Sequence, residues 1–379
     1  MKKNNLQICM GTFLAAALVF GQTVQADELI LRGNQTISDD ADVSVIIVGN
    51  SGANSTSGDG HLIVNSGATL ANFDGNSPTL SGRIDGVEYH HEDGYLGFNA
   101  GSTGTATVTG EDTLWDNSSG GLYTGYLGQA LLVVEEGGRV VSEQGYLGYQ
   151  AGSTGAAVVT GVDSRWDNLG NLYIGGNASS TGGQGNLVVN DGGVVSADEG
   201  ATIWSVGSLA GKGGMLEGDV INHGLISPGN SANPFGVLTI TGDLVLEESS
   251  TLVFEIFDPT LYDQLFVNGD FTMGGSLALD FDNFIQSAFD TTYDLIQVGG
   301  NLTGTWDNFD INTSTGFDSS LLTYSVAGSD SLGYSQVLRL TVAGVGNPKN
   351  PIPEPATVLL IGLGGMMMLW QWRRSALAS

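Results

Sequence analysis

The sequence predicts an all-β protein, a right-handed parallel β-helix or β-solenoid, with an N-terminal signal peptide and a C-terminal single transmembrane helix. Glycine makes up 59 of the 379 residues, and Val, Leu, Ile and Thr fill the stretches between the glycines. This mixture suits short strands separated by tight turns, because glycine reaches positive φ without steric cost. A 51-residue repeat without helical periodicity favours stacked coils. Two apolar segments flank this body.

Residues 1–26 have the features of a signal peptide. Two lysines provide the positive start, an apolar run covers 6–20, and Val-Gln-Ala forms a small-x-small cleavage site. We therefore expect signal peptidase to cut between Ala26 and Asp27, which places the body outside the cytoplasm.

The body is strongly acidic and contains no thiol. All 40 acidic residues but only seven of the 11 basic residues lie between Asp27 and Glu354, which gives this segment a net charge of −33. Such a surface repels nucleic acid and anionic lipid, so no nucleic-acid partner is expected. The sole cysteine, Cys9, lies in the leader. We therefore expect no disulfide or cysteine-bound metal in the body.

The predicted solenoid covers residues 27–280, and its clearest repeats lie at 94–200. The sequence pattern of residues 94–117, from Gly-Tyr-Leu-Gly to Trp-Asp-Asn, recurs without a gap at 145–168, 51 residues later. A β-helix coil takes roughly 20–25 residues, so each unit should form two coils. One coil cannot bury its apolar face, whereas stacked coils can.

The repeated sequence resembles repeats shared by autotransporter passenger domains and PEP-CTERM proteins. Residues 226–269 resemble the last passenger coils of autotransporter β-helices, beginning Ile-Ser-Pro-Gly-Asn-Ser. The departure is that no run of long alternating strands follows residue 345, so export through a barrel of its own is not expected.

Residues 281–345 are less regular and richer in phenylalanine. We interpret them as a β-rich terminal cap that covers the open end of the solenoid, or as a small separate β-domain. The phenylalanines proposed to close that end are Phe281, Phe284, Phe289, Phe309 and Phe317. Residues 346–352 form a proline-rich linker.

The segment 356–372 is uncharged and 17 residues long. At about 1.5 Å per residue, a helix there spans roughly 25 Å, near the short limit for crossing a bilayer. Trp370 and Trp372 stand where an interfacial aromatic belt belongs, and Arg373 and Arg374 place this end in the cytoplasm by the positive-inside rule.

Residues 353–379 resemble the PEP-CTERM sorting signal. The matching parts are Pro353, Glu354 and Pro355, then the glycine-bearing apolar helix, then Arg373 and Arg374. The resemblance implies recognition by an exosortase, a transpeptidase-like membrane enzyme, with cleavage near the Pro-Glu-Pro. An ordinary single-span anchor is the alternative. Either way the body lies outside the inner membrane of a Gram-negative-type bacterium.

Two tryptophans are candidate glycan contacts. Trp115 and Trp166 each precede Asp-Asn in the repeat, an aromatic platform beside polar groups. Their recurrence at one repeat position favours a structural role, with the indole packed in the coil and Asp-Asn in the turn. Tyr95, Tyr126 and Tyr146 recur likewise and receive the same interpretation.

No constellation of catalytic or metal-binding residues emerges. The cluster His90, His91, Glu92 and Asp93 is dense, but adjacent side chains of a strand point to opposite faces. We predict no metal and no cofactor. Calcium-binding repeat motifs, nucleophile elbows and phosphate loops are absent from the sequence.

These features together predict an exported, non-catalytic protein of the cell surface or extracellular matrix. The partners expected are signal peptidase, an exosortase, the membrane before processing, and exopolysaccharide in a biofilm matrix. The alternatives are an adhesin that binds glycans or cell surfaces, and a carbohydrate-active β-helix enzyme, since β-helices also carry convergent carboxylates for sugar chemistry.

Overall fold

The protein is all-β. The computed structural model describes residues 24–26, 29–31, 34–39, 41–43, 46–49, 59–72, 81–84, 87–229, 235–281, 284, 286–312, 319–329, 331 and 333–344. These residues form strands, turns and one 3-10 helix, η1 (Ser319–Leu321). No helix among them is both long and apolar enough to traverse a bilayer. The predicted transmembrane segment 356–372 lies outside the described residues.

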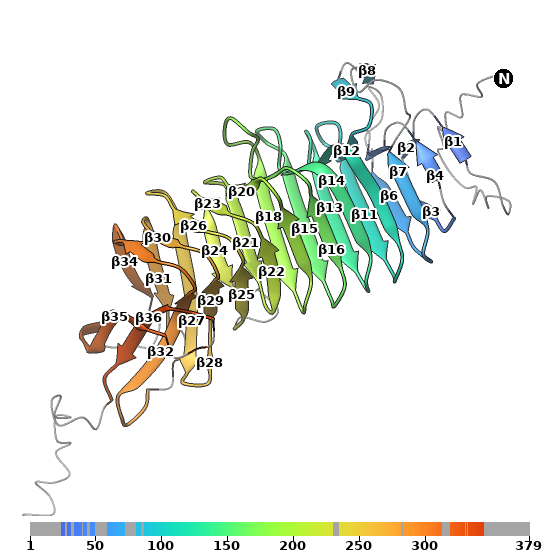
Figure 1. Ribbon diagram of the computed structural model, residues 1–379. Coiled ribbons are helices and arrows are strands. Elements are labelled where there is room, and N and C mark those ends of the chain that lie inside the picture. Colours follow the sequence, from blue (N-terminus) through green and yellow to red (C-terminus); the bar gives the residue numbers. More distant parts are fainter. Residues whose placement is uncertain are drawn as a thin grey trace, which may run out of the picture.

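The strands stack side by side along one long axis, in chain order from the N-terminal end to the C-terminal end (Figure 1). A twelve-stranded sheet lies along one side of this stack. Its neighbouring strands pair in parallel, except for the short strand β28, which is antiparallel to β27. Its strands are β3 (Asn34–Ile37), β6 (Gly60–Val64), β11 (Thr103–Thr109), β13 (Gln129–Glu135), β15 (Thr154–Thr160), β18 (Gln184–Asn190), β21 (Gly207–Gly211), β24 (Leu225–Pro228), β27 (Thr251–Asp258), β28 (Leu261–Tyr262), β31 (Ser276–Asp280) and β34 (Asn308–Asn312).

A 22-stranded sheet forms the remaining sides and contains two runs of strands that share the long strands β12 and β14. Pairing within both runs is parallel except where β36 joins β32 and β35. The first run comprises β1 (Val24–Ala26), β4 (Ala41–Val43), β7 (Thr69–Asn72), β12 (Leu114–Thr124), β14 (Arg139–Leu147), β16 (Arg165–Asn168), β19 (Val194–Ala197), β22 (Gly214–Glu217), β25 (Val237–Ile240), β29 (Gln264–Val267), β32 (Thr291–Val298), β36 (Gln336–Val342) and β35 (Leu322–Gly328). The second comprises β2 (Leu29–Leu31), β5 (Ile46–Val48), β10 (Gly94–Leu96), β12, β14, β17 (Asn171–Ile174), β20 (Gly200–Ile203), β23 (Val220–Asn222), β26 (Leu244–Leu246), β30 (Phe271–Met273) and β33 (Leu302–Gly304).

The register explains the 51-residue repeat. Thr103 in β11 lies opposite Gln129 in β13, which in turn lies opposite Thr154 in β15. Trp115 and Trp166 are related in the same way through Val140. Residues one repeat unit apart therefore lie two strands apart, and each unit supplies two layers of the stack.

Local sequence fixes both the strands and their turns. In β13, β15 and β18 every second residue is buried, which is the alternation expected of a strand with one face on a core. Each of the turns after β13 and β18 holds two successive residues at positive φ, Glu136–Gly137 and Asp191–Gly192. A glycine at the second position relieves the strain of such a turn.

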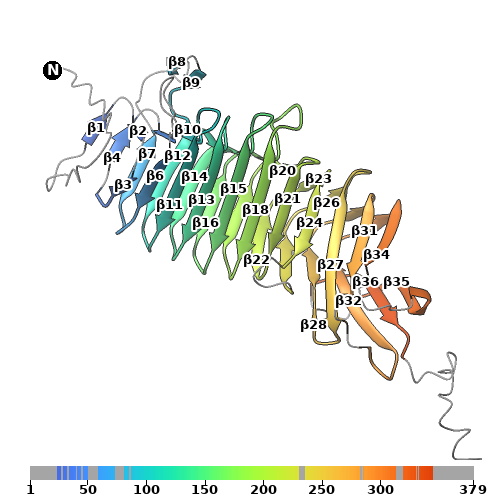
Figure 2. The ribbon, with the colours of Figure 1, turned by 180° about the vertical axis from the view of Figure 1, so that it is seen from behind.

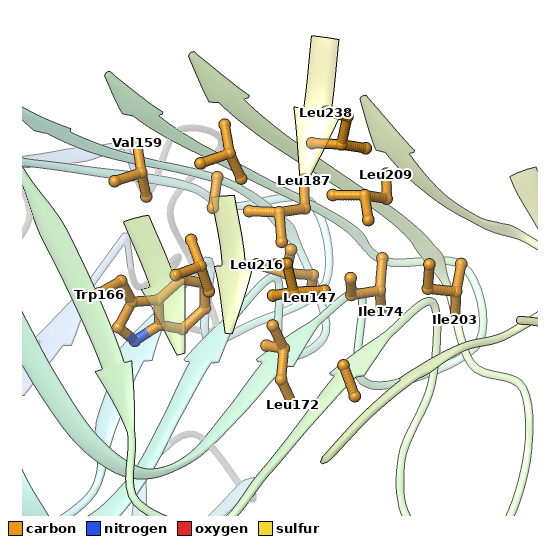
Figure 3. Close-up of a cluster of buried hydrophobic side chains, with 14 of the residues drawn as sticks. Leu147, Val159, Trp166, Leu172, Ile174, Leu187, Ile203, Leu209, Leu216 and Leu238 are labelled. Carbon is orange, nitrogen blue, oxygen red and sulfur yellow. The ribbon is translucent and has the colours of Figure 1, made fainter. Parts of the chain in front are cut away.

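One continuous apolar core runs through the stack. Inward residues from the twelve-stranded sheet and from both runs of the 22-stranded sheet meet in it, including Leu147, Trp166, Leu187 and Leu216 (Figure 3). All four side chains are fully buried, and this burial requires contact between several layers of strands.

The parallel stack continues past residue 280, the predicted end of the solenoid. The strands β32, β33 and β34 pair in parallel with β29, β30 and β31. Antiparallel pairing begins with β36, which joins β32 and β35. The boundary therefore differs from the sequence-based one, because strands β32–β34 pair in parallel with the preceding layer although their sequence is irregular. Figure 2 shows this end of the stack from behind.

The phenylalanines proposed to close this end behave differently from one another. Phe281 is fully buried, whereas Phe289 is 80% exposed. Phe284 and Phe309 are half-buried against the core, and Phe309 stacks on Tyr324 of β35. Phe317 lies outside the described residues.

Candidate functional site

The two tryptophans proposed as glycan contacts lie inside the core. Trp115 and Trp166 have no exposed surface. The indole Nε1 of Trp115 donates to Oδ1 of Asn72 at 3.1 Å, and that of Trp166 donates to Oγ of Ser142 at 3.1 Å. No ring face is available to a sugar, so the glycan-contact interpretation is wrong in this structure, and both rings are structural.

The Asp-Asn pair after each tryptophan lies in a strand, not in the predicted turn. Asn168 points inward and its amide Nδ2 donates to the carbonyl oxygen of Ser196 at 2.9 Å. Asp167 is 5% exposed and its carboxylate accepts hydrogen bonds from Arg139, Arg165 and Ser196. Alternation within the strand separates the two side chains, which a turn assignment could not foresee.

The recurring tyrosines form two columns on the outside of the second run, which we call the aromatic ladder. In the first column Tyr95, Tyr123, Tyr146 and Tyr173 stack with centroid distances of 4.9, 4.6 and 5.4 Å. In the second column Phe98, Tyr126 and Tyr149 stack at 5.5 and 5.3 Å.

The two columns meet edge to face. Tyr123 contacts Tyr126 at 5.4 Å and Tyr149 at 5.0 Å, with interplanar angles of 78° and 90°. Edge-to-face pairs are a favoured geometry of aromatic rings, because the positive ring edge meets the negative ring face. The structural interpretation of the tyrosines therefore fits, although Tyr149 and the two-column arrangement escaped the sequence reasoning.

The repeated Gly-Tyr-Leu-Gly motif supplies tyrosines of the aromatic ladder. In β10 and β14 the tyrosine faces outward and the following leucine, Leu96 or Leu147, is buried in the core. Parallel pairing in register then places each tyrosine beside the next, as with Tyr95 and Tyr123. The hairpin of β8 (Ser81–Ile84) and β9 (Val87–His90) covers the N-terminal end of the ladder with Tyr89.

A carboxyl group is buried beneath that end. Asp93 is 7% exposed. Its Oδ2 accepts a hydrogen bond of 2.7 Å from the hydroxyl of Tyr95, and its Oδ1 accepts one of 2.7 Å from the backbone N–H of Gly121. Burial raises the pKa of Asp93 to about 6, although both hydrogen bonds lower it.

Burial also raises the pKa of the ladder tyrosines well above the usual value of 10. The negative charge of Asp93 adds to this effect on the pKa of Tyr95 and Tyr123. At acidic pH the carboxyl group of Asp93 and the hydroxyl groups of these tyrosines are uncharged. They form hydrogen bonds and contribute to packing.

The dense cluster of His90, His91, Glu92 and Asp93 does not converge on one point. His90 is exposed, whereas Glu92 and Asp93 are buried, and Glu92 has a positive φ of 72°. Within the described part of the chain, no group of three or more His, Cys, Asp and Glu residues has a spacing that suits a metal ion.

A second buried carboxyl group escaped the sequence reasoning. Asp263 is fully buried, and its two carboxylate oxygens accept backbone N–H groups from Gly236 and Glu255, each at 2.8 Å. Burial raises the pKa of Asp263 to about 8, against the lowering effect of these bonds. Asp263 lies between β28 and β29, and these bonds tie it to β27 and to the segment before β25 in the preceding layer.

The processing sites fall at or beyond the limits of the described residues. Ala26 ends β1, which pairs in parallel with β4, whereas Asp27 is outside the described residues. The sorting residues Pro353, Glu354, Pro355, Arg373 and Arg374 are also outside them.

Comparison with protein families identifies one feature of the chain. Residues 351–375 match the PEP-CTERM protein-sorting motif. No curated protein matches the sequence significantly. The motif indicates an exported, membrane-anchored protein that an exosortase sorts to the surface, and it coincides with the predicted sorting tail at 353–379.

Proposed function

We propose that this chain is a non-catalytic structural or interaction protein of the bacterial cell surface or extracellular matrix. In this proposal the body is a right-handed parallel β-helix that the sorting tail delivers. The observation that carries the proposal is the PEP-CTERM motif at 351–375, which follows a long stack of strands that is parallel as far as β34 and ends with the antiparallel strand β36. The exopolysaccharide matrix is the setting in which we expect the body to act.

The strand pairings support the β-helix assignment. The chain passes from β15 to β16, β17 and β18, and thus visits the twelve-stranded sheet, the first run and the second run before it returns. Each return pairs in parallel with the strand one layer before, as Thr154 does with Gln184. Right-handedness follows from the general rule for connections between parallel strands.

The buried polar groups support a structural role. Asp93, Asp167 and Asp263 each receive hydrogen bonds from side chains or backbone of adjacent layers. Carboxyl groups engaged in this way hold layers together and are not directed at a substrate. The adhesin alternative loses Trp115 and Trp166 as contact residues, because both are buried.

The sorting claim is tested by replacing Pro353, Glu354 and Pro355 with alanine in the full chain. Pro348→Ala, which lies before the matched motif, is the control. Cells are fractionated, and the intact mass of the protein in each fraction gives both termini. We expect the wild type and the control to begin at Asp27, to end near the Pro-Glu-Pro and to leave the inner membrane. The triple variant should keep its tail and stay there; identical masses and fractions for all three would refute the sorting claim.

The enzyme alternative has a separate test. The purified mature protein is incubated with a panel of polysaccharides, and soluble products are measured by reducing-end assay and mass spectrometry. The proposal predicts no release above a heat-treated control. Reproducible release would overturn the non-catalytic assignment while leaving the sorting claim intact.

A further inference from the structure

Between β6 and β24 the outer face of the twelve-stranded sheet is almost free of charge in an otherwise acidic chain. Asp, Glu, Lys and Arg are absent from β6, β11, β15, β18, β21 and β24, and β13 carries only Glu135, at its last position. The centre of this face consists of Leu131, Val133, Ala156, Val158, Asn186 and Val188, all half-buried and outward-facing. We call the outward side of β6 to β24 the neutral face. The chain as a whole carries a net charge of −29.

Charge gathers mainly at one edge of the neutral face. The turns that follow its strands carry Glu111, Asp112, Glu136, Asp163 and Asp191, and Lys212 follows β21. The turns that precede β11, β13, β15 and β18, residues 97–102, 125–128, 148–153 and 175–183, contain no charged residue, whereas Asp59 precedes β6. Along β11 to β18 the face is therefore bounded by an acidic edge on one side and an uncharged edge on the other.

The neutral face is also regular and continuous. Its strands lie side by side along the long axis (Figure 1). They pair in register, so Thr107, Val133, Val158 and Val188 form one outward column. Interfaces between proteins are depleted of charge at their centre, and two sheets pack face to face about 10 Å apart through such columns. Contiguous exposed apolar patches on a soluble surface mark sites of association, and the centre of this face is largely apolar.

We propose that the neutral face binds a second copy of this chain, face to face, about a two-fold axis parallel to the long axis of the stack. A rotation about that axis reverses strand direction between the copies. Each acidic edge then lies against the uncharged edge of the other copy. A two-fold axis along the strands would instead place acidic edge against acidic edge.

The distribution of charge favours a second copy over an unrelated partner. Two chains with a charge of −29 each repel one another, and the neutral face lets them meet without opposing carboxylates. Association should strengthen as salt rises, because salt screens the long-range repulsion but does not weaken apolar contact. A partner held by opposite charge would show the reverse dependence. The inference does not depend on the route of export.

The test compares Val158→Asp with Val194→Asp in the full chain. Val194 is an outward, half-buried valine of β19 on another side of the stack, next to Arg165 in the pairing, so it receives the same substitution away from the neutral face. Mass is measured by light scattering and sedimentation across a concentration series at low and high salt, and circular dichroism checks the fold.

We expect the mass of two chains for the wild type and for Val194→Asp. Val158→Asp should raise the dissociation constant at least about tenfold, which corresponds to about 1.4 kcal/mol. A monomeric wild type at every concentration would overturn the proposal, as would equal effects of the two substitutions. A monomer that binds a neutral polysaccharide through Val158 would also overturn it and assign the face to a glycan.

Cross-linking provides a second measurement should Val158→Asp fail to fold. Cys9 is the only cysteine in the chain, so a Cys9→Ser background has no other thiol. A short bismaleimide should join two chains through Val158→Cys but not through Val194→Cys. Equal yields of dimer from both positions, or none from Val158→Cys, would contradict the proposed interface.

Discussion

The hydroxyl of Tyr95 donates a 2.7 Å hydrogen bond to Oδ2 of Asp93, so a buried carboxyl group is fastened to the covered end of the aromatic ladder. The pair links the turn after β9 to β10, and the bond from Gly121 N–H extends the link to β12. Two ionisable groups thereby become part of the packing between layers, and their protonation becomes part of the stability of the fold.

Stability should fall as pH rises through the pKa of Asp93. Its folded pKa, about 6, lies above the reference value of 3.8, so the folded state holds the proton more tightly. The contribution is complete below about pH 4 and lost as pH rises through about 6, with an upper bound of about 3 kcal/mol. Asp93→Asn should remove this contribution and leave that of Asp263, whose pKa burial also raises, as measured by urea unfolding between pH 4 and 8. The exposed Asp198→Asn is the control, and parallel curves for wild type and Asp93→Asn would contradict the prediction.

The aromatic ladder should make the protein sensitive to alkali. Because the folded pKa of Tyr95, Tyr123 and Tyr146 is raised above 10, their contribution is present below pH 10 and lost as pH rises further. We expect tyrosinate absorbance to develop together with loss of the β-sheet circular dichroism signal. Tyr123→Phe should shift the unfolding pH, whereas Tyr324→Phe, at a side chain that is 52% exposed, should not. Full ionisation of the tyrosines in folded protein would contradict this.

Removing one buried tryptophan should be costly. Trp166→Ala leaves a cavity in the continuous core and should lower the free energy of unfolding by about 3–5 kcal/mol. Trp166→Phe should cost less, because it keeps most of the apolar volume and loses only the bond to Ser142. Chemical denaturation measures both. Trp204→Ala, at a half-buried side chain, is the comparison. A larger loss of unfolding free energy for Trp204→Ala than for Trp166→Ala would argue against the core position of Trp166.

Close approach of the layers should make the fold sensitive to substitution of Gly155. A Cβ at Gly155 would overlap the backbone oxygen of Thr124 and the backbone nitrogen of Gly148, and neither can move without displacing a strand. Gly155→Ala should therefore lower the free energy of unfolding by about 1–3 kcal/mol. Gly328→Ala, where the added carbon meets open space, should change it by less than about 1 kcal/mol. Equal effects in thermal unfolding would refute the steric argument.

Part of the fold could be predicted from particular residues. The alternation within residues 129–135 predicts a strand with one buried face, and the 51-residue spacing of Trp115 and Trp166 predicts two layers per repeat. The same repetition favoured a structural role for the tryptophans, and burial confirms it. The sorting tail was predicted because its three parts follow one another in order, which requires no tertiary contact, and the motif at 351–375 supports it.

Tertiary structure decided which side chains meet. Asp93 and Gly121, or Asp263 and Gly236, are brought together only when separate layers stack in one register. The continuation of the stack through β34 likewise depends on pairing across layers, not on local pattern. The sequence by itself determined the strand class, the repeat length and the processing tail, because these follow from local spacing and composition. The aromatic ladder, the buried carboxyl groups and the neutral face follow from parallel stacking, which places residues from different layers side by side.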